Sequence, residues 1–230
     1  MLDVTLHFRN NREPKYFISP AGNHRGSTQT IQEIHEWDFF LTYLENNLKI
    51  NSFIEVGTAW GGSLYGFAQI SSPDATIITI DDNSKNCKFE DLQDKENKIR
   101  EYGKPGQKMH FIHMDSHSQE CDDKVKGILG DNKVDFLFID GDHSYDGVKA
   151  DYQTYSKYVR EGGCIGFHDV AGFQEQEGVK RHWDEIKGDY VHMEVLWLTR
   201  RRGLGLLHFT KDIDGQNPID FFHTKDRKAI

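Results

Sequence analysis

The chain of 230 residues contains little cysteine. The three cysteines, Cys87, Cys121 and Cys164, lie far apart, so they predict neither a disulfide framework nor a Cys-x-x-Cys metal site. The sequence has no apolar run long enough to span a bilayer, and its first twenty residues lack the apolar centre of a signal peptide. We therefore expect a cytoplasmic protein with free thiols and no membrane contact.

Basic charge is scarce as well. The 28 Lys and Arg residues are outnumbered by 37 Asp and Glu residues, which gives a formal net charge of −9. Proteins that bind nucleic acids gain affinity by neutralising phosphates, so this balance argues against such a partner. The dense basic cluster Arg200, Arg201 and Arg202 is more typical of a solvated hairpin turn. A small-molecule partner is expected, and a homo-oligomer is compatible with the sequence.

The length suits one globular domain with a single core. Residues 1–29 are polar and rich in breakers, which predicts an N-terminal arm or lid. Residues 30–211 carry the regular apolar patterns and form the predicted domain. Residues 212–230 are a polar C-terminal tail.

Strand-like and helix-like segments alternate through the domain. Apolar runs at 53–56, 75–80, 109–114, 134–139 and 164–167 predict five strands, and helical patterns separate them. Further helices are predicted at 31–48 and 176–186. Two last runs, 192–198 and 204–209, are close enough to form an antiparallel hairpin. This alternation predicts an α/β fold around a mostly parallel sheet.

A glycine-rich turn follows the first apolar run of the domain. Residues 53–67 read FIEVGTAWGGSLYGF, which predicts a strand, a tight turn and a helix. The bare backbone at such a turn lets a polar or anionic ligand approach a helix N-terminus. No lysine follows Gly61 and Gly62, so a P-loop is excluded, and the spacing from Gly57 does not match the dinucleotide fingerprint. The turn alone predicts a nucleotide-like cofactor, with a ligand-free tight turn as the alternative.

Acidic side chains follow the predicted strands. Asp81 comes 24 residues after Gly57, close to where a βαβ unit places a carboxylate against ribose hydroxyls, although its neighbour Asp82 could take that position. Asp115 and Asp140 follow two later strands. Because the carboxyl ends of parallel strands share one edge, we expect these groups to converge on one crevice.

Several of these segments resemble class I S-adenosylmethionine-dependent methyltransferases over roughly residues 31–210. FIEVGTAWGGS resembles the first motif of that superfamily, and ITIDD resembles its ribose acid. FLFIDGDHSYDGVKADY and GGCIGFHDV resemble the subgroup that includes cephalosporin-pathway and macrolide-sugar O-methyltransferases. The resemblance implies a Rossmann-like, seven-stranded, mostly parallel sheet with an antiparallel C-terminal hairpin and helices on both faces.

The resemblance also implies roles for individual residues. Asp81 would hold the ribose of S-adenosylmethionine, and Asp115 with Ser116 would face the adenine. The residues implied at the amino-acid end of the cofactor are Glu55, Gly57, Thr58, Gly61, Gly62 and Ser63.

Related enzymes bind Mg²⁺ through acids that follow the fourth and fifth strands. The matching positions here are Asp140, His168 and Asp169, which are therefore the implied metal ligands. His168 departs from the pattern, because imidazole suits Zn, Fe, Ni or Mn better than Mg²⁺. A divalent ion at the substrate oxygen would favour its alkoxide. The implied reaction is metal-assisted O-methylation of a small hydroxylated acceptor, with Mg²⁺ or Mn²⁺ as the ion.

His143 lies where catechol-type enzymes carry a lysine. It could accept the acceptor's proton beside Asp140, since its pKa lies near working pH. The alternative is that His143 caps the helix that begins near Ser144 and takes no part in catalysis.

Two other functions fit parts of the sequence. Tyr145 and Lys149 have the Tyr-x-x-x-Lys spacing of NAD(P)-dependent short-chain oxidoreductases, although the glycine spacing does not suit that family. A cofactor-binding protein without turnover is the third reading, and the acids at Asp140 and Asp169 argue against it.

Overall fold

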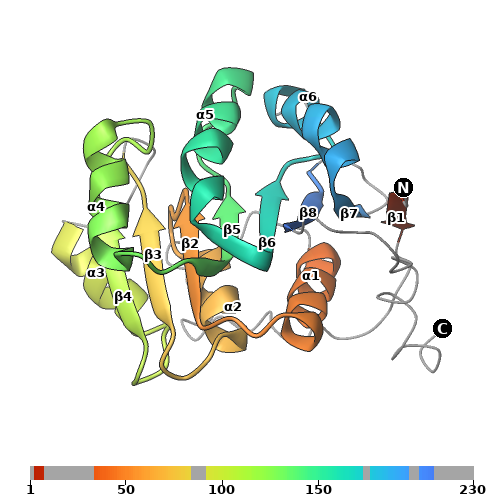
Figure 1. Ribbon diagram of the computed structural model, residues 1–230. Coiled ribbons are helices and arrows are strands. Elements are labelled where there is room, and N and C mark those ends of the chain that lie inside the picture. Colours follow the sequence, from red (N-terminus) through yellow and green to blue (C-terminus); the bar gives the residue numbers. More distant parts are fainter. Residues whose placement is uncertain (1–2, 8–33, 84–91, 173–176, 197–201, 210–230) are drawn as a thin grey trace.

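The computed structural model describes residues 3–7, 34–83, 92–172, 177–196 and 202–209. Within these ranges, eight strands form one sheet between two layers of helices (Figure 1). The strands are β1 (Asp3–His7), β2 (Ser52–Val56), β3 (Thr76–Ile80), β4 (Lys108–Ile112), β5 (Val134–Ile139), β6 (Val159–His168), β7 (Val191–Leu196) and β8 (Leu204–Phe209). The helices are α1 (Ile34–Asn47), α2 (Gly62–Ile70), α3 (Leu92–Arg100), α4 (Gln119–Leu129), α5 (Tyr145–Tyr155) and α6 (Glu177–Ile186).

The strand order is β1-β7-β8-β6-β5-β2-β3-β4. Strands β2 to β6 pair with one another in parallel, and β8 lies antiparallel between β6 and β7. The predicted mostly parallel sheet and the C-terminal hairpin are therefore confirmed. The sheet also has an eighth strand, β1, which pairs in parallel with β7 and which the sequence analysis did not predict.

Two apolar layers hold the helices against the sheet. On one face, α1 and α2 bring Trp37, Phe40 and Phe67 onto Phe136 and Phe138 of β5, with ring centroids 4.8–6.5 Å apart. On the other face, α4, α5 and α6 pack on the aliphatic side chains of the same strands. Because both faces are covered, the central strands read as continuous apolar runs in the sequence.

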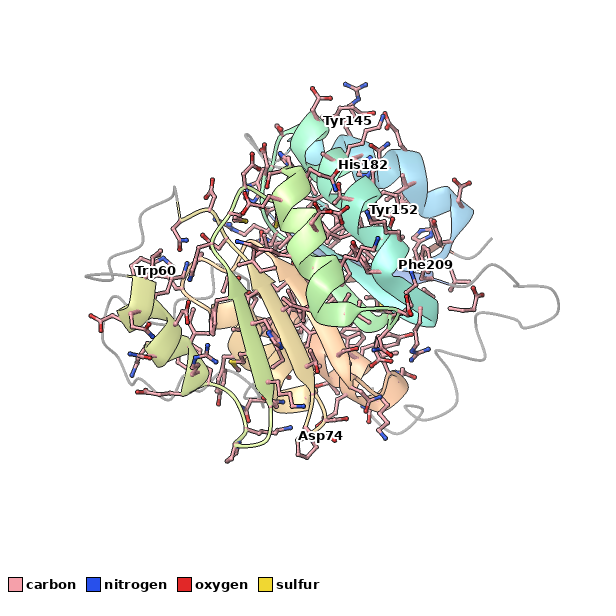
Figure 2. The ribbon with its side chains drawn as sticks, turned by 60° about the vertical axis from the view of Figure 1, so that its left-hand side comes forward. Trp60, Asp74, Tyr145, Tyr152, His182 and Phe209 are labelled. Atoms are coloured by element: carbon pink, nitrogen blue, oxygen red, sulfur yellow. The ribbon has the colours of Figure 1, made fainter. Side chains whose placement is uncertain are left out.

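The parallel strands fix where polar groups can gather. Asp74, on the connection that enters β3, and Tyr145, which begins α5 after β5, lie at opposite ends of the molecule (Figure 2). Strands β2 to β6 all run toward the end that holds Tyr145. Their carboxyl ends therefore form one edge, where open α/β sheets bind ligands.

Some boundaries differ from the sequence prediction. Strand β6 begins at Val159 instead of Cys164, because Val159 already pairs with Val134 before a register irregularity. The helix predicted between the strands at 75–80 and 109–114 is described from Leu92 to Arg100, and residues 84–91 lie outside the described ranges. Most of the predicted arm and the whole predicted tail also lie outside them. Within the described residues, no helix combines the length and apolar character that crossing a bilayer requires.

Candidate active site

The glycine turn after β2 lies directly against the end of β5. Gly57 has a φ of 87°, and a Cβ there would lie 2.0 Å from the Asp140 carbonyl oxygen. The amide of Asp140 donates to the Val56 carbonyl at 2.8 Å. Gly57 is thus required by a close backbone contact between two strand ends. The turn then reaches Gly61, in the left-handed conformation, which precedes α2 as its N-cap without a side-chain cap.

Glu55 is a fully buried carboxylate on β2. Its Oε1 accepts a hydrogen bond from the Ser63 hydroxyl at 2.6 Å, while Oε2 has no partner among the described residues. Burial raises the pKa of Glu55 to about 8, against the opposing effect of the Ser63 hydrogen bond and with a further rise from nearby Asp140 and Asp81. Glu55 is therefore close enough to Asp140 and Asp81 for the charges of these two acids to affect its ionisation.

Asp81 follows β3 and faces the glycine turn. Its Oδ2 accepts the backbone amides of Thr58, at 3.1 Å, and of Ala59. Its Oδ1 accepts the backbone amide of Asn83 at 2.7 Å. The buried Lys95 ammonium lies 3.4 Å from Oδ2. The carboxylate predicted to bind ribose is thus fixed by donors from the turn and from its own loop.

The two residues predicted to face adenine have different surroundings. The Asp115 side chain is 68% exposed, and its Oδ1 accepts the amide of His117 at 2.9 Å. Ser116 donates its hydroxyl to Asp151 Oδ1 at 2.6 Å. Asp151, on α5, is fully buried, and burial raises its pKa to about 6. Asp151 links the loop after β4 to α5; it lies in the segment FLFIDGDHSYDGVKADY, but the resemblance implied no role for it.

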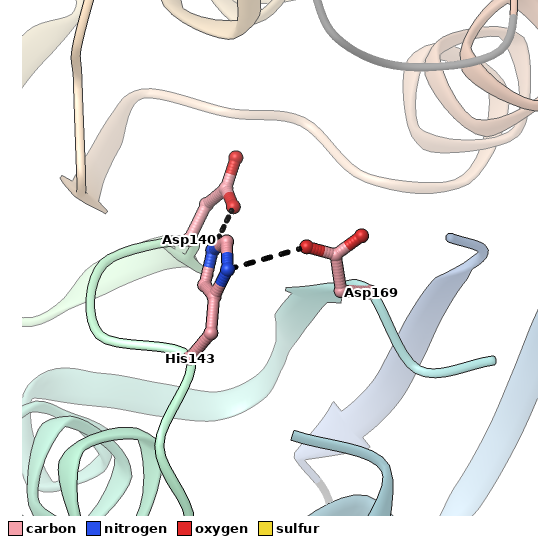
Figure 3. A group of neighbouring side chains, drawn as sticks. All are labelled: Asp140, His143 and Asp169. Atoms are coloured by element: carbon pink, nitrogen blue, oxygen red, sulfur yellow. Dashed lines mark hydrogen bonds and ion pairs between the residues drawn. The ribbon is translucent and has the colours of Figure 1, made fainter. Parts of the chain in front are cut away.

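Asp140, His143 and Asp169 form a compact group at the ends of β5 and β6 (Figure 3). One ligand atom from each lies within 4.8 Å of the others. His143 stands between the two acids, with Nε2 3.4 Å from Asp140 Oδ1 and Nδ1 3.6 Å from Asp169 Oδ2. The two acids predicted as metal ligands are therefore neighbours, and the histidine predicted to be catalytic lies between them.

His168 contacts the same two acids from the buried side. Its Nδ1 is 3.0 Å from Asp140 Oδ1 and 3.3 Å from Asp169 Oδ2, and its Nε2 has no partner among the described residues. Burial alone would lower the pKa of His168, but the two acids raise it to about 10. Burial would likewise raise the pKa of Asp140, but His168 and His143 hold it below its usual range. The hydrogen bond to Asp140 raises the pKa of His143 despite its burial.

Asp169 is the acid in this group that lacks hydrogen bonds. It is fully buried, and neither oxygen accepts a hydrogen bond from a described residue. Its φ of 62° is unusual for a non-glycine residue, and such strain concentrates at functional sites. Buried carboxylates are normally paired or bound to metals, and the contacts of Asp169 with His168 and His143 both involve Oδ2, which leaves Oδ1 open. Two carboxylates and the His143 imidazole make a donor set that fits a divalent ion, and the role of His168 as a ligand stays a prediction.

The helix cap beside His143 is a different residue. Ser144 is the N-cap of α5, and its hydroxyl accepts the Gly147 amide at 3.0 Å. The reading in which His143 caps this helix is therefore wrong, because the neighbouring serine does so. The His143 ring is turned toward the two acids.

Tyr145 and Lys149 serve to join two helices. Lys149 donates to the Tyr145 hydroxyl at 3.1 Å, and that hydroxyl donates to Glu185 of α6 at 2.6 Å. Arg181, also of α6, lies over the Tyr145 ring at 3.9 Å. The tyrosine and lysine that suggested an oxidoreductase thus take part in the packing of α5 against α6.

A family model described as a methyltransferase domain matches residues 54–170, slightly more than half of the chain. An uncharacterized protein of Acanthamoeba polyphaga mimivirus is 34% identical over 140 residues, which cover 60% of each protein. An uncharacterized protein of Sinorhizobium fredii is 22% identical over 187 residues, 78% of this chain and 20% of that protein. The chain thus spans 60% and 20% of the lengths of these curated relatives.

Solved structures share the fold at low sequence identity. The O-methyltransferase TomG of Streptomyces achromogenes, solved with S-adenosylmethionine, has a TM-score of 0.56 at 17% identity, covering 78% of this chain and 81% of its own. An O-methyltransferase of Bacillus cereus, solved with S-adenosylhomocysteine, has a TM-score of 0.54 at 14% identity, covering 85% and 84%. These solved structures share the Rossmann-like fold, and the match over residues 54–170 leads to one conclusion: this chain belongs to the methyltransferase-domain family.

Proposed function

We propose that this protein transfers the methyl group of S-adenosylmethionine to a hydroxyl group of a small acceptor, with help from a divalent ion. The observation that carries the proposal is the convergence of Glu55, Asp81 and Asp140 around one glycine turn. Asp81 accepts the amide of Thr58, Asp140 touches Gly57, and both acids raise the pKa of Glu55. A cluster of carboxylates suits a ligand that carries a sulfonium, an ammonium and two ribose hydroxyls.

Each acid has a distinct part in this proposal. The open oxygen of Glu55, with Asp140, would receive the cofactor's ammonium group, near the start of α2. Asp81 would accept a ribose hydroxyl through Oδ1, which takes a single hydrogen bond from the described residues. Asp115 and Ser116, at the end of β4, would border the adenine. These assignments keep the cofactor along the ends of β2, β3, β4 and β5.

The acceptor hydroxyl would lie beside His143. Asp140, His143 and Asp169 would hold a divalent ion, whose Lewis acidity lowers the pKa of an alcohol bound to it. An imidazole ligand favours Mn²⁺ or another first-row transition metal over Mg²⁺. His168 would contact both carboxylates from the side of the sheet and orient them through Nδ1. The exposed face of His143 leaves it accessible to the acceptor.

Titration calorimetry and turnover together test the proposal. The protein should bind S-adenosylmethionine and S-adenosylhomocysteine but not NADH. Turnover of small alcohols, phenols and sugars should be measured after EDTA treatment and after addition of Mn²⁺ or Mg²⁺. Restoration by a metal is the expected result. Binding of NADH alone would overturn the methyltransferase assignment, and full turnover in EDTA would remove the ion from it.

A further inference from the structure

Lys95 is a buried lysine beside the ribose acid. It lies on α3. The other charged residues of this helix are not buried, whereas Lys95 is only 1% exposed. Its Nζ lies 2.7 Å from Asn83 Oδ1 and 3.4 Å from Asp81 Oδ2. Lysines are almost never fully buried unless they are paired. The pairing of Lys95 is directed at the loop that follows β3.

Asn83 joins the lysine to the acid. Its backbone amide donates to Asp81 Oδ1 at 2.7 Å, and its Nδ2 donates to the Asp81 carbonyl at 3.0 Å. Because an ammonium group only donates, the amide oxygen of Asn83 must face Lys95. The φ of 60° at Asn83 is a conformation that asparagine tolerates better than most residues.

A histidine continues the chain of contacts back to α3. Asn83 Nδ2 lies 3.0 Å from His113 Nδ1, which must accept because the amide nitrogen donates. His113 Nε2 therefore carries the proton and donates to Glu96 Oε1 at 2.9 Å. Lys95 and Glu96, consecutive residues of one helix, thus hold Asn83 from two sides. The Asp81 carboxylate is fixed by a brace that starts on α3.

We propose that Lys95 is a positioning residue for the cofactor. Lys95 orients Asp81 through Asn83, and its positive charge makes the electrostatic potential at the cofactor site less negative. The inference rests on the proposed function. The edge around Glu55, Asp81 and Asp140 is rich in carboxylates, and Lys95 offsets part of that charge behind Asp81. S-adenosylmethionine carries a sulfonium charge that its product S-adenosylhomocysteine lacks. Loss of the Lys95 charge should therefore favour the charged cofactor over the neutral product.

The test uses two variants that separate position from charge. Lys95→Met keeps the apolar stem and removes the charge, whereas Asn83→Gly keeps the backbone conformation and removes the brace. Dissociation constants for S-adenosylmethionine, S-adenosylhomocysteine and adenosine are measured by calorimetry for each protein. Lys98→Met is the matched control, because Lys98 lies on the same helix and pairs with exposed Glu101.

Both variants should weaken adenosine binding, by about tenfold, since Asp81 loses its orientation. Lys95→Met should also change the affinity ratio of S-adenosylmethionine to S-adenosylhomocysteine by about three- to tenfold in favour of the former. Asn83→Gly and Lys98→Met should leave that ratio unchanged.

An unchanged ratio in a folded Lys95→Met protein would overturn the electrostatic role, and unchanged adenosine affinity in both variants would overturn the brace. Far-ultraviolet circular dichroism and thermal unfolding establish that each variant is folded. If Lys95→Met does not fold, an unchanged adenosine affinity in Asn83→Gly alone overturns the brace. Wild-type protein that binds none of the three ligands would instead refute the proposed function.

Discussion

Asp81 and Asp169 both follow parallel strands at one edge of the sheet, and the chain treats them differently. Asp81 receives hydrogen bonds from Thr58, Ala59 and Asn83 and lies near Lys95. Asp169 is more deeply buried, yet neither of its oxygens accepts a hydrogen bond from the described residues. Backbone amides hold both oxygens of Asp81, whereas Asp169 is approached through Oδ2 by the rings of His143 and His168 and keeps Oδ1 open to a ligand. The first suits recognition of a neutral hydroxyl, and the second suits a cation.

The largest effect should come from the acid without hydrogen bonds. Asp169→Asn removes the charge that a cation would meet but keeps the shape of the side chain. We expect metal-stimulated turnover to fall by about a hundredfold or more, close to 3 kcal/mol in the barrier. Cofactor affinity, measured by calorimetry, should stay within about twofold.

Asp123→Asn on α4 is the control for this change, since Asp123 is exposed and accepts a hydrogen bond from exposed Gln119. Full metal-stimulated turnover in Asp169→Asn would show that the open carboxylate has no part in binding a metal, and the contrast with Asp81 would lose its functional meaning.

Glu55 stands between the two cases, with one satisfied oxygen and one open oxygen. Its folded-state pKa of about 8 lies above the roughly 4.3 expected in the unfolded chain, so the folded protein binds the extra proton between these values. Wild-type stability should therefore fall as pH rises from 5 to 8, by roughly 3 kcal/mol from this group. Glu55→Gln should remove this part of the pH dependence.

Urea unfolding of the cofactor-free protein at several pH values measures the Glu55 effect. Glu120→Gln, an exposed substitution on α4, should keep the wild-type dependence. If the free energy of unfolding depends on pH equally in wild type and in Glu55→Gln, Glu55 ionises normally and is not affected by burial or by the neighbouring acids.

Replacing Asp81 should have a smaller effect than the changes at Asp169 and Glu55, and the effect should be on cofactor binding. Asp81→Ala should weaken S-adenosylmethionine binding by more than about tenfold, or about 1.4 kcal/mol, because a charge-assisted contact to the ribose is lost. The adjacent Asp82→Ala change, on an exposed side chain, should alter the affinity by less than about twofold. The opposite ranking would move the ribose contact by one residue.

The smallest effect concerns the helix that follows His143. Ser144→Ala removes the cap on α5 and should lower the free energy of unfolding by about 1 kcal/mol. The turnover number should change only slightly if the position of His143 depends on Asp140 and Asp169. A loss of turnover comparable to that of Asp169→Asn would instead mean that the cap determines the orientation of His143.

The sequence predicted the strand ends well because buried parallel strands are continuous apolar runs that stop at polar residues. Asp81, Asp140 and Asp169 were found for this reason, and the parallel order brought them to one edge. β1 escaped prediction because a five-residue strand at the sheet edge depends on its partner, β7, which is distant in sequence.

Side-chain partners were harder to predict than positions. Lys95 appears in the sequence as one more charge on a polar helix, and only its approach to Asn83 distinguishes it from Lys98. His143 could have capped α5 until Ser144 was seen to do so. Asp151 became notable through a contact with Ser116, 35 positions away. Such choices depend on packing between elements, which local sequence patterns do not encode.

The contact between Gly57 and the Asp140 carbonyl couples the position of the turn after β2 to the position of the β5 end. Any side chain at position 57 would push the β5 end away from the turn, so the proposed cofactor site and the group of Asp140, His143 and Asp169 would shift together. A change that improved one of them at this joint would disturb the other. Variation in acceptor preference would therefore have to arise elsewhere, in segments that move neither strand end.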